Sequence, residues 1–134
     1  MQEDFKYVDI TRKIIGCAMN VHNYLGPGFY ESIYQRCLLI ELFESGLDCK
    51  SEVVKDIYYR GQFVGKRRLD ILVEDKVLVE LKAISVIDNS CFNKILNYLK
   101  VFKIDVGLLL NFGTPSLSYK RFANSKSSAK SNHP

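Results

Sequence analysis

No apolar run in this 134-residue sequence approaches the roughly 18 residues that a membrane-spanning helix needs. The N-terminus, MQEDFKYVDITRK, mixes acids with bases and lacks the apolar stretch of a secretion signal. Only two histidines, His22 and His133, are present, which excludes most histidine-based triads and multi-histidine metal sites. The four cysteines form no C-x-x-C pair and show no zinc-ligand spacing. We therefore expect a soluble cytoplasmic protein in which hydrolytic chemistry would depend on carboxylates and lysines.

Positive charge is unevenly distributed along the chain, whose formal net charge is +4. The last 15 residues contain no acid and hold four bases, Lys120, Arg121, Lys126 and Lys130. Removing these four from the 19 bases leaves 15, which face 15 acids in residues 1–119, so the body of the chain is neutral. A charged tail is usually solvated, and only some short basic arms touch nucleic acid. The candidate phosphate contacts are a second, local cluster of bases: Arg60, Lys66, Arg67 and Arg68.

The periodicity of apolar residues predicts one α/β domain over residues 1–122. Helical spacing occurs over 8–24, 30–45 and 88–103, where Asp88 is expected to cap the third helix. Strands are predicted over 52–59, 68–73, 77–83, 106–110 and 117–122, and the connection after the first of them should contain Gly61, Gly65 and the basic cluster. A helix between the third and fourth strands indicates a parallel crossover. The expected sheet is therefore mixed, with an antiparallel three-strand meander, a crossover strand and flanking helices. Residues 123–134 form a polar, basic tail that we expect to be disordered.

The stretch RLDILVEDKVLVELKA is the most informative part of the chain. A loop over 74–76 would pair Val73 with Val77 and place Asp70 directly opposite Glu80. One face of this hairpin would then be apolar, with Leu69, Ile71, Val73, Val77, Val79, Leu81 and Ala83. The other face would carry Arg68, Asp70, Leu72, Leu78, Glu80 and Lys82.

Two carboxylates facing each other across a sheet oppose folding unless something compensates their charge. A shared divalent cation, a raised pKa that keeps one acid protonated, and an exposed face neutralised by Lys82 and Arg68 are three alternatives that the sequence leaves open. Glu31 adds a third acid at the start of the second predicted helix. There it either interacts with the helix dipole or lies at the rim of the helix–sheet contact, one turn before Tyr34.

These residues together resemble the GxxExxY proteins. The run Gly28-Phe29-Tyr30-Glu31-Ser32-Ile33-Tyr34 matches the pattern that defines this family. Further matching blocks follow in order: Val21–Pro27 before this run, then Leu69–Val73, Val79–Ala83, Leu96–Lys100 and Gly107–Phe112. The resemblance spans about residues 8–122, nearly the whole of the predicted domain. The family is placed in the PD-(D/E)xK nuclease-like superfamily, which implies a restriction-endonuclease-like core.

The resemblance also implies a function, the metal-dependent hydrolysis of phosphodiester bonds in DNA or RNA. By this resemblance, Asp70 and Glu80 would bind Mg²⁺ or Mn²⁺, and Glu31 would be the helix-borne acid that completes the metal site. Lys82 would orient or polarise the attacking water, and Tyr34 would pack or hydrogen-bond beside Glu31.

Two other functions stay open, because a fold does not fix an activity. The chain could be a non-catalytic module that keeps the nuclease fold and binds nucleic acid or protein, or a small structural subunit of a larger complex. Similar proteins often have glutamine near the position of Lys94, and an inward-pointing Lys94 would add a positive charge to the site. The sequence leaves open whether the protein forms a homodimer.

Overall fold

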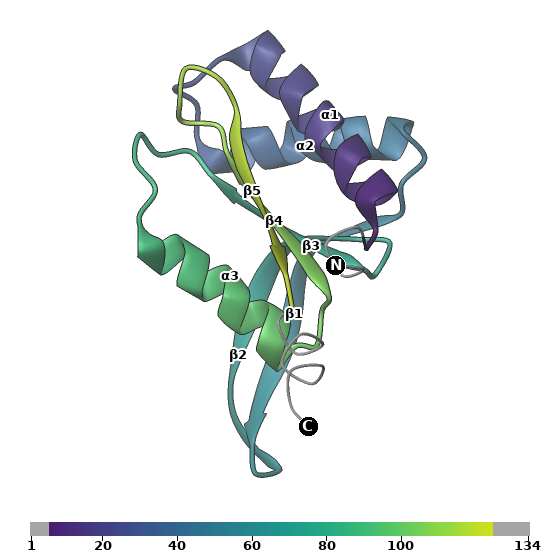
Figure 1. Ribbon diagram of the computed structural model, residues 1–134, viewed down its shortest axis with the longest axis vertical. Coiled ribbons are helices and arrows are strands. Elements are labelled where there is room, and N and C mark those ends of the chain that lie inside the picture. Colours follow the sequence, from purple (N-terminus) through teal and green to yellow (C-terminus); the bar gives the residue numbers. More distant parts are fainter. Residues whose placement is uncertain (1–5, 125–134) are drawn as a thin grey trace, which may run out of the picture.

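The computed structural model describes residues 6–124, which form three helices and one five-stranded sheet (Figure 1). In chain order the elements are α1 (Val8–Leu25), α2 (Glu31–Glu44), β1 (Cys49–Tyr59), β2 (Gln62–Val73), β3 (Val77–Lys82), α3 (Asn89–Val101), β4 (Val106–Asn111) and β5 (Ser118–Ala123). The strands lie in the order β1-β2-β3-β4-β5. The β3–β4 pair is parallel and the others are antiparallel. The predicted α/β fold, with its meander and crossover strand, is therefore confirmed.

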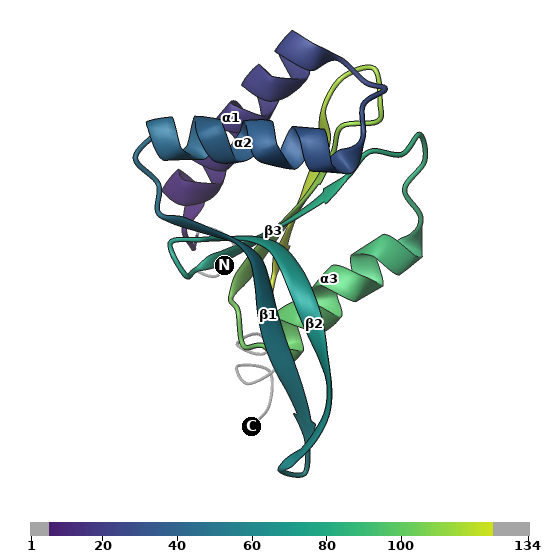
Figure 2. The same ribbon diagram turned by 180° about the vertical axis from the view of Figure 1, so that it is seen from behind.

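Helices cover both faces of the sheet (Figures 1 and 2). Helices α1 and α2 pack on one face, against alternate residues of β2, β3 and β4 such as Ile71, Val79 and Leu108. Helix α3 packs on the other face, against the residues between them, such as Leu72 and Leu109. Because both faces of the central strands are covered, all six residues of β4 are buried, as a continuous apolar run indicates.

Local contacts fix the position of α3. Asp88 caps this helix as predicted, because its side chain accepts a hydrogen bond from the Ser90 backbone N–H at 3.0 Å. Gly107 of β4 lets the helix approach closely, since a Cβ atom there would lie 3.1 Å from Ile95 Cδ1. After β5, the Asn124 side-chain amide donates to the backbone carbonyls of Leu99 and Ile104.

The structure corrects the prediction for β2. This strand begins at Gln62, so only Arg60 and Gly61 connect β1 to β2. Both have positive φ, 51° and 79°, which suits a two-residue hairpin turn. Gly65 continues the strand opposite Ile57 instead of interrupting it. The bases Lys66, Arg67 and Arg68 therefore lie on the strand, and only Arg60 lies in the turn.

The predicted face of Leu69 is also wrong. This residue packs in the α3 core with Leu72 and Leu78, although strict alternation would place it on the face of Ile71. Alternation fails here because Leu69 precedes the paired segment. Strand β2 pairs with β3 only from Ile71 to Val73, and its earlier residues diverge from β3 together with β1 (Figure 2).

Two predictions concern the ends of the chain. Residues 125–134 of the predicted tail lie outside the described residues, whereas Ala123 ends β5 and Asn124 contacts the end of α3. Within residues 6–124, no helix is both long enough and apolar enough to cross a membrane.

Candidate active site

The predicted register of the β2–β3 hairpin is confirmed, and it places Asp70 and Glu80 at the point where the strands separate. Val73 pairs with Val77, and the regular pairing ends at Ile71 with Val79. Beyond that point the two carboxylates bridge the strands: the Asp70 N–H donates to Glu80 Oε2 at 3.0 Å, and the Leu81 N–H donates to Asp70 Oδ2 at 2.9 Å. Each acid thus holds the backbone of the opposite strand, and the two carboxylates are brought together.

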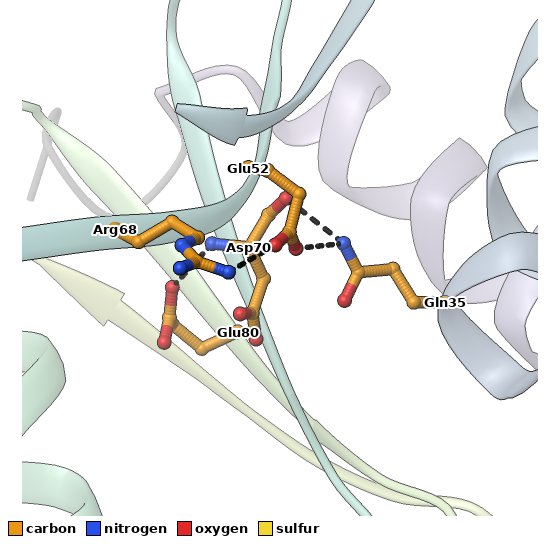
Figure 3. A network of polar contacts seen from close by, with 5 residues as sticks. All are labelled: Gln35, Glu52, Arg68, Asp70 and Glu80. Carbon is orange, nitrogen blue, oxygen red and sulfur yellow. Dashed lines mark hydrogen bonds and ion pairs between the residues drawn. The ribbon is translucent and has the colours of Figure 1, made fainter. Parts of the chain in front are cut away.

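The β1 side of Asp70 is also irregular (Figure 3). Glu52 has φ of 54° and is absent from the β1–β2 register, which passes from Ser51 to Val53. The Asp70 carbonyl accepts a hydrogen bond from Gln35 Nε2 of α2 at 3.2 Å instead. The left-handed backbone of Glu52 costs about 1 kcal/mol. Its carboxylate gains two short hydrogen bonds, from Gln35 Nε2 and Arg68 Nη1, both at 2.8 Å.

Gln35 and Glu52 are the site residues that sequence reasoning missed. Gln35 follows Glu31 by one helical turn on α2, so the two share a helix face. That spacing was the available signal for Gln35. The position of Glu52 depends on a backbone irregularity that no local pattern indicates.

Burial dominates the electrostatics of the acid pair. Glu80 is only 5% exposed, and this burial, together with the Asp70 carboxylate, raises its pKa to about 7. Burial also raises the pKa of Asp70, while the Leu81 N–H and the Lys94 ammonium act against that shift. The sequence leaves three ways to compensate the negative charge of the two acids. Exposure to solvent is excluded for Glu80, because this side chain is buried. A raised pKa, which keeps an acid protonated, applies when no metal is present.

Two lysines face these acids from different elements. Lys82 ends β3 and is half-buried, and its charge lowers the pKa values of Glu31, Asp70 and Glu80. Lys94 of α3 points toward the same pair, with its Nζ 3.9 Å from Glu80 Oε1. The Lys94 side chain remains 46% exposed, so this is a partly solvated ion pair that compensates only part of the buried charge.

Glu31 is the first residue of α2, where an acid interacts favourably with the helix dipole. Its pKa is raised by partial burial and by Asp70, and lowered by Lys82 and Lys94, so it belongs to the same charged cluster. Tyr34, one turn later, is fully buried and stacks on Phe112 with ring centroids 4.6 Å apart. Its hydroxyl donates to the Gly26 carbonyl and accepts from the Phe29 N–H at 3.2 Å, which fixes the loop that leads to Glu31.

The donor set fits a divalent cation held by two carboxylates. Asp70 Oδ2 and Glu80 Oε2 accept backbone hydrogen bonds, while Asp70 Oδ1 and Glu80 Oε1 take no backbone N–H of the opposite strand. Mg²⁺ commonly binds one or two carboxylates and completes its shell with water and substrate phosphate. Across residues 6–124, no three acid, histidine or cysteine side chains are grouped closely enough to hold a metal. The predicted metal role of Glu31 is therefore corrected: it is within electrostatic range of Asp70 but is not placed to share a cation with the pair.

The four predicted phosphate contacts lie in different places, and Lys66 is on β2 opposite Asp56. Arg68 pairs with Glu52 beside the acids, and Arg67 lines a groove of about 560 Å³ together with Lys94 and Tyr98 of α3. Arg60 lies in the β1–β2 turn. The groove thus lies between α3 and Arg67 of β2, and Lys94 in its lining is 3.9 Å from Glu80 Oε1.

The comparisons with known proteins agree with this geometry. The family model described as the PD-(D/E)XK nuclease superfamily matches residues 8–122. The chain belongs to the PD-(D/E)XK nuclease superfamily. No curated protein matches the chain. Membership of this superfamily does not by itself establish catalytic activity, because one fold hosts several functions.

Among solved structures, this PD-(D/E)XK chain is similar to the one titled "Crystal structure of SSO0001". The TM-score is 0.55 and the sequence identity is 19%, over 70% of this chain and 50% of that one. The chain therefore spans about half the length of SSO0001, and at this identity the likeness concerns the fold alone.

Proposed function

We propose that the protein is a metal-dependent nuclease of the GxxExxY family that hydrolyses phosphodiester bonds in DNA or RNA. The observation that carries this proposal is the crossed pair of Asp70 and Glu80 at the opening between β2 and β3, with Lys82 alongside. A buried acid next to a half-buried one destabilises a fold unless their negative charge is compensated. Binding a divalent cation is the compensation that this donor set and the superfamily both favour.

Each residue of the site has a distinct proposed role. Asp70 and Glu80 would hold Mg²⁺ or Mn²⁺, which when bound supplies charge stabilisation at phosphorus and favours ionisation of water. Lys82, two residues after Glu80 on the same strand, would orient the attacking water and share a proton with it. Glu31 would accept a hydrogen bond from that water at the other side of the cluster. Buried Tyr34 holds Glu31 in place through the preceding loop.

A non-catalytic nucleic-acid-binding module is the second candidate function, and Lys94 is the observation that favours it. Its ammonium lies near Glu80, where it already offsets part of the negative charge that would attract a divalent cation. Such a module would bind nucleic acid without metal, with strong salt dependence and no product.

For either function we also propose that residues 1–122 form one domain that acts in the cytoplasm.

The two candidates are separated by incubating the purified protein with single- and double-stranded DNA and RNA in Mg²⁺, in Mn²⁺ or in EDTA. We expect cleavage of at least one substrate with metal and none in EDTA. The double variant Asp70→Asn, Glu80→Gln keeps the side-chain shapes and should be inactive. Cleavage that is equal in this variant would show that another site or a contaminant is responsible, and binding without any product would support the non-catalytic module.

A further inference from the structure

The hairpin formed by β1 and β2 extends beyond the rest of the sheet. We call residues 54–68 the arm. Over this segment β1 and β2 pair only with each other, because β2 joins β3 only from Ile71 onward. Figures 1 and 2 show the arm projecting away from α1 and α2. No residue of the arm is buried, so the structure assigns its side chains no role in the core.

The arm carries positive charge on an otherwise neutral body. Its five bases are Lys55, Arg60, Lys66, Arg67 and Arg68, and its single acid is Asp56. The chain contains 19 bases and 15 acids, so removing the arm leaves 14 bases against 14 acids. The arm is therefore net +4 and the rest of the chain is net neutral. Such a local excess of positive charge attracts a polyanion to the arm.

Three exposed aromatic rings lie near the tip of the arm, on either side of Arg60. Tyr58, Tyr59 and Phe63 are 61%, 63% and 56% exposed. Tyr58 and Phe63 meet edge to face across the hairpin with centroids 6.1 Å apart, and the Arg60 guanidinium lies 5.4 Å from the centroid of the Tyr59 ring. Exposed rings interleaved with cations are the arrangement by which proteins bind single-stranded nucleic acid, since every unpaired base offers a face for stacking.

The composition of the arm favours an unpaired strand over a duplex. Proteins that read a duplex sequence through a groove usually combine basic contacts to guanine with Asn, Gln, Ser or Thr contacts to the other bases. The arm contains no Ser, Thr or Asn, and Gln62 is its one side-chain amide. A duplex would also hide the faces of its bases from Tyr58 and Phe63. The arm of a second copy is disfavoured as the occupant, because two arms of net +4 repel each other.

We propose that the arm binds single-stranded nucleic acid independently of metal, with its bases contacting phosphates and Tyr58 and Phe63 stacking on nucleobases. The groove between Arg67 and α3 then leads the strand toward Lys94 and the acid pair. The delivery of the strand to Asp70 and Glu80 rests on the proposed nuclease function, whereas the binding itself does not.

The test is fluorescence anisotropy in EDTA, with fluorescein-labelled oligothymidylate and oligouridylate and with a blunt DNA duplex as probes. We expect tighter binding to the single strands than to the duplex. The double variant Tyr58→Leu, Phe63→Leu should weaken single-strand binding by about tenfold. The variant Phe43→Leu, which removes an exposed ring from α2, is the matched control and should bind like the parent protein.

Charge is tested separately through the salt dependence of binding. The variant Lys66→Gln, Arg67→Gln should reduce the steepness of log K against log[salt] by about 0.7 for each phosphate that the variant no longer neutralises. The control Arg12→Gln, Lys13→Gln makes the same change of charge on exposed positions of α1 and should leave the slope unchanged. Arg60→Asn keeps a residue that tolerates the positive φ of the turn, so it removes one charge without disturbing the hairpin.

Several results would overturn the proposal. These are equal binding by the ring variant and its parent, a preference for the duplex, competition by polyglutamate as strong as that by oligothymidylate, or an arm-dependent dimer at the assay concentration. Unchanged melting temperatures confirm that each variant is folded. Binding is measured without metal, so the two proposals can fail separately. If the protein binds single strands but cleaves no substrate, only the proposed nuclease function is refuted. If it cleaves but does not bind single strands through the arm, only the proposed role of the arm is refuted.

Discussion

The variant Lys82→Gln is expected to lose phosphodiester hydrolysis by about 10²- to 10⁴-fold while keeping its fold. Lys82 is the one cation on the strand that carries Glu80, and its charge lowers the pKa values of the three acids of the site. A glutamine of similar length keeps the packing of the half-buried side chain but can neither carry the charge nor exchange a proton with water.

The matched control for this variant is Lys100→Gln, which makes the same substitution on an exposed position of α3. Initial rates of both variants should be compared at saturating Mn²⁺ and normalised to the folded fraction, because removing Lys82 also leaves the acid pair less compensated. If Lys82→Gln and Lys100→Gln cleave at the same rate, the role that we propose for Lys82 is wrong.

The stability of the metal-free protein is expected to fall as the pH rises from about 4.5 to about 7. The pKa of Glu80 is raised by burial, and secondarily by Asp70, from 4.5 to about 7, so the folded state binds this proton more tightly than the unfolded chain does. The stability that the protonated acid provides is complete below pH 4.5 and is lost as the pH rises through about 7. For a buried group this corresponds to about 3 kcal/mol of unfolding free energy.

Urea denaturation in EDTA across this pH window measures the effect. Glu80→Gln should flatten the fall, whereas Lys94→Gln should enlarge it, because the Lys94 ammonium lowers the pKa of Glu80. Adding Mn²⁺ should also flatten it, since a bound cation favours the ionised pair. A profile that is flat or rising in the metal-free parent would show that Glu80 is not desolvated as the structure indicates.

The central hairpin could be predicted from the sequence because its determinants are local. Two apolar strands around a short polar loop favour one register, because a shift by one residue would move every side chain to the other face of the sheet. The placement of Asp70 opposite Glu80 follows from that register, and the crossed hydrogen bonds confirm it. The cap at Asp88 and the buried strand β4 are local features of the same kind.

The parts that escaped prediction depend on tertiary contacts. Alternation predicts the face of Leu69 only while β2 stays paired with β3, and the sequence does not mark where the strands separate. Likewise, Glu52 leaves the ladder because Gln35 of α2 reaches the Asp70 carbonyl and Arg68 holds the Glu52 carboxylate. The sequence predicts that Gly65 interrupts the strand. The β1–β2 register does shift next to it, between Ile57 and Tyr58, but Gly65 itself remains paired with Ile57.

These irregularities have a common consequence for the site. At Asp70 the strand has lost regular pairing on both sides, and side chains from α2, β1 and β3 replace the missing ladder bonds (Figure 3). On a fully paired strand, regular alternation would fix the face of the sheet to which a carboxylate points. Here the opened ladder directs both acids into one place, where Lys82 and Lys94 can reach them.

The most direct test of the metal site is the anomalous difference map from a crystal of the protein soaked in Mn²⁺. We predict a peak bridged by the carboxylates of Asp70 and Glu80, which disappears in the variant Asp70→Asn, Glu80→Gln. A map without density between these two acids at saturating Mn²⁺, or with its only strong peak elsewhere, would contradict a metal-dependent nuclease centred on this pair.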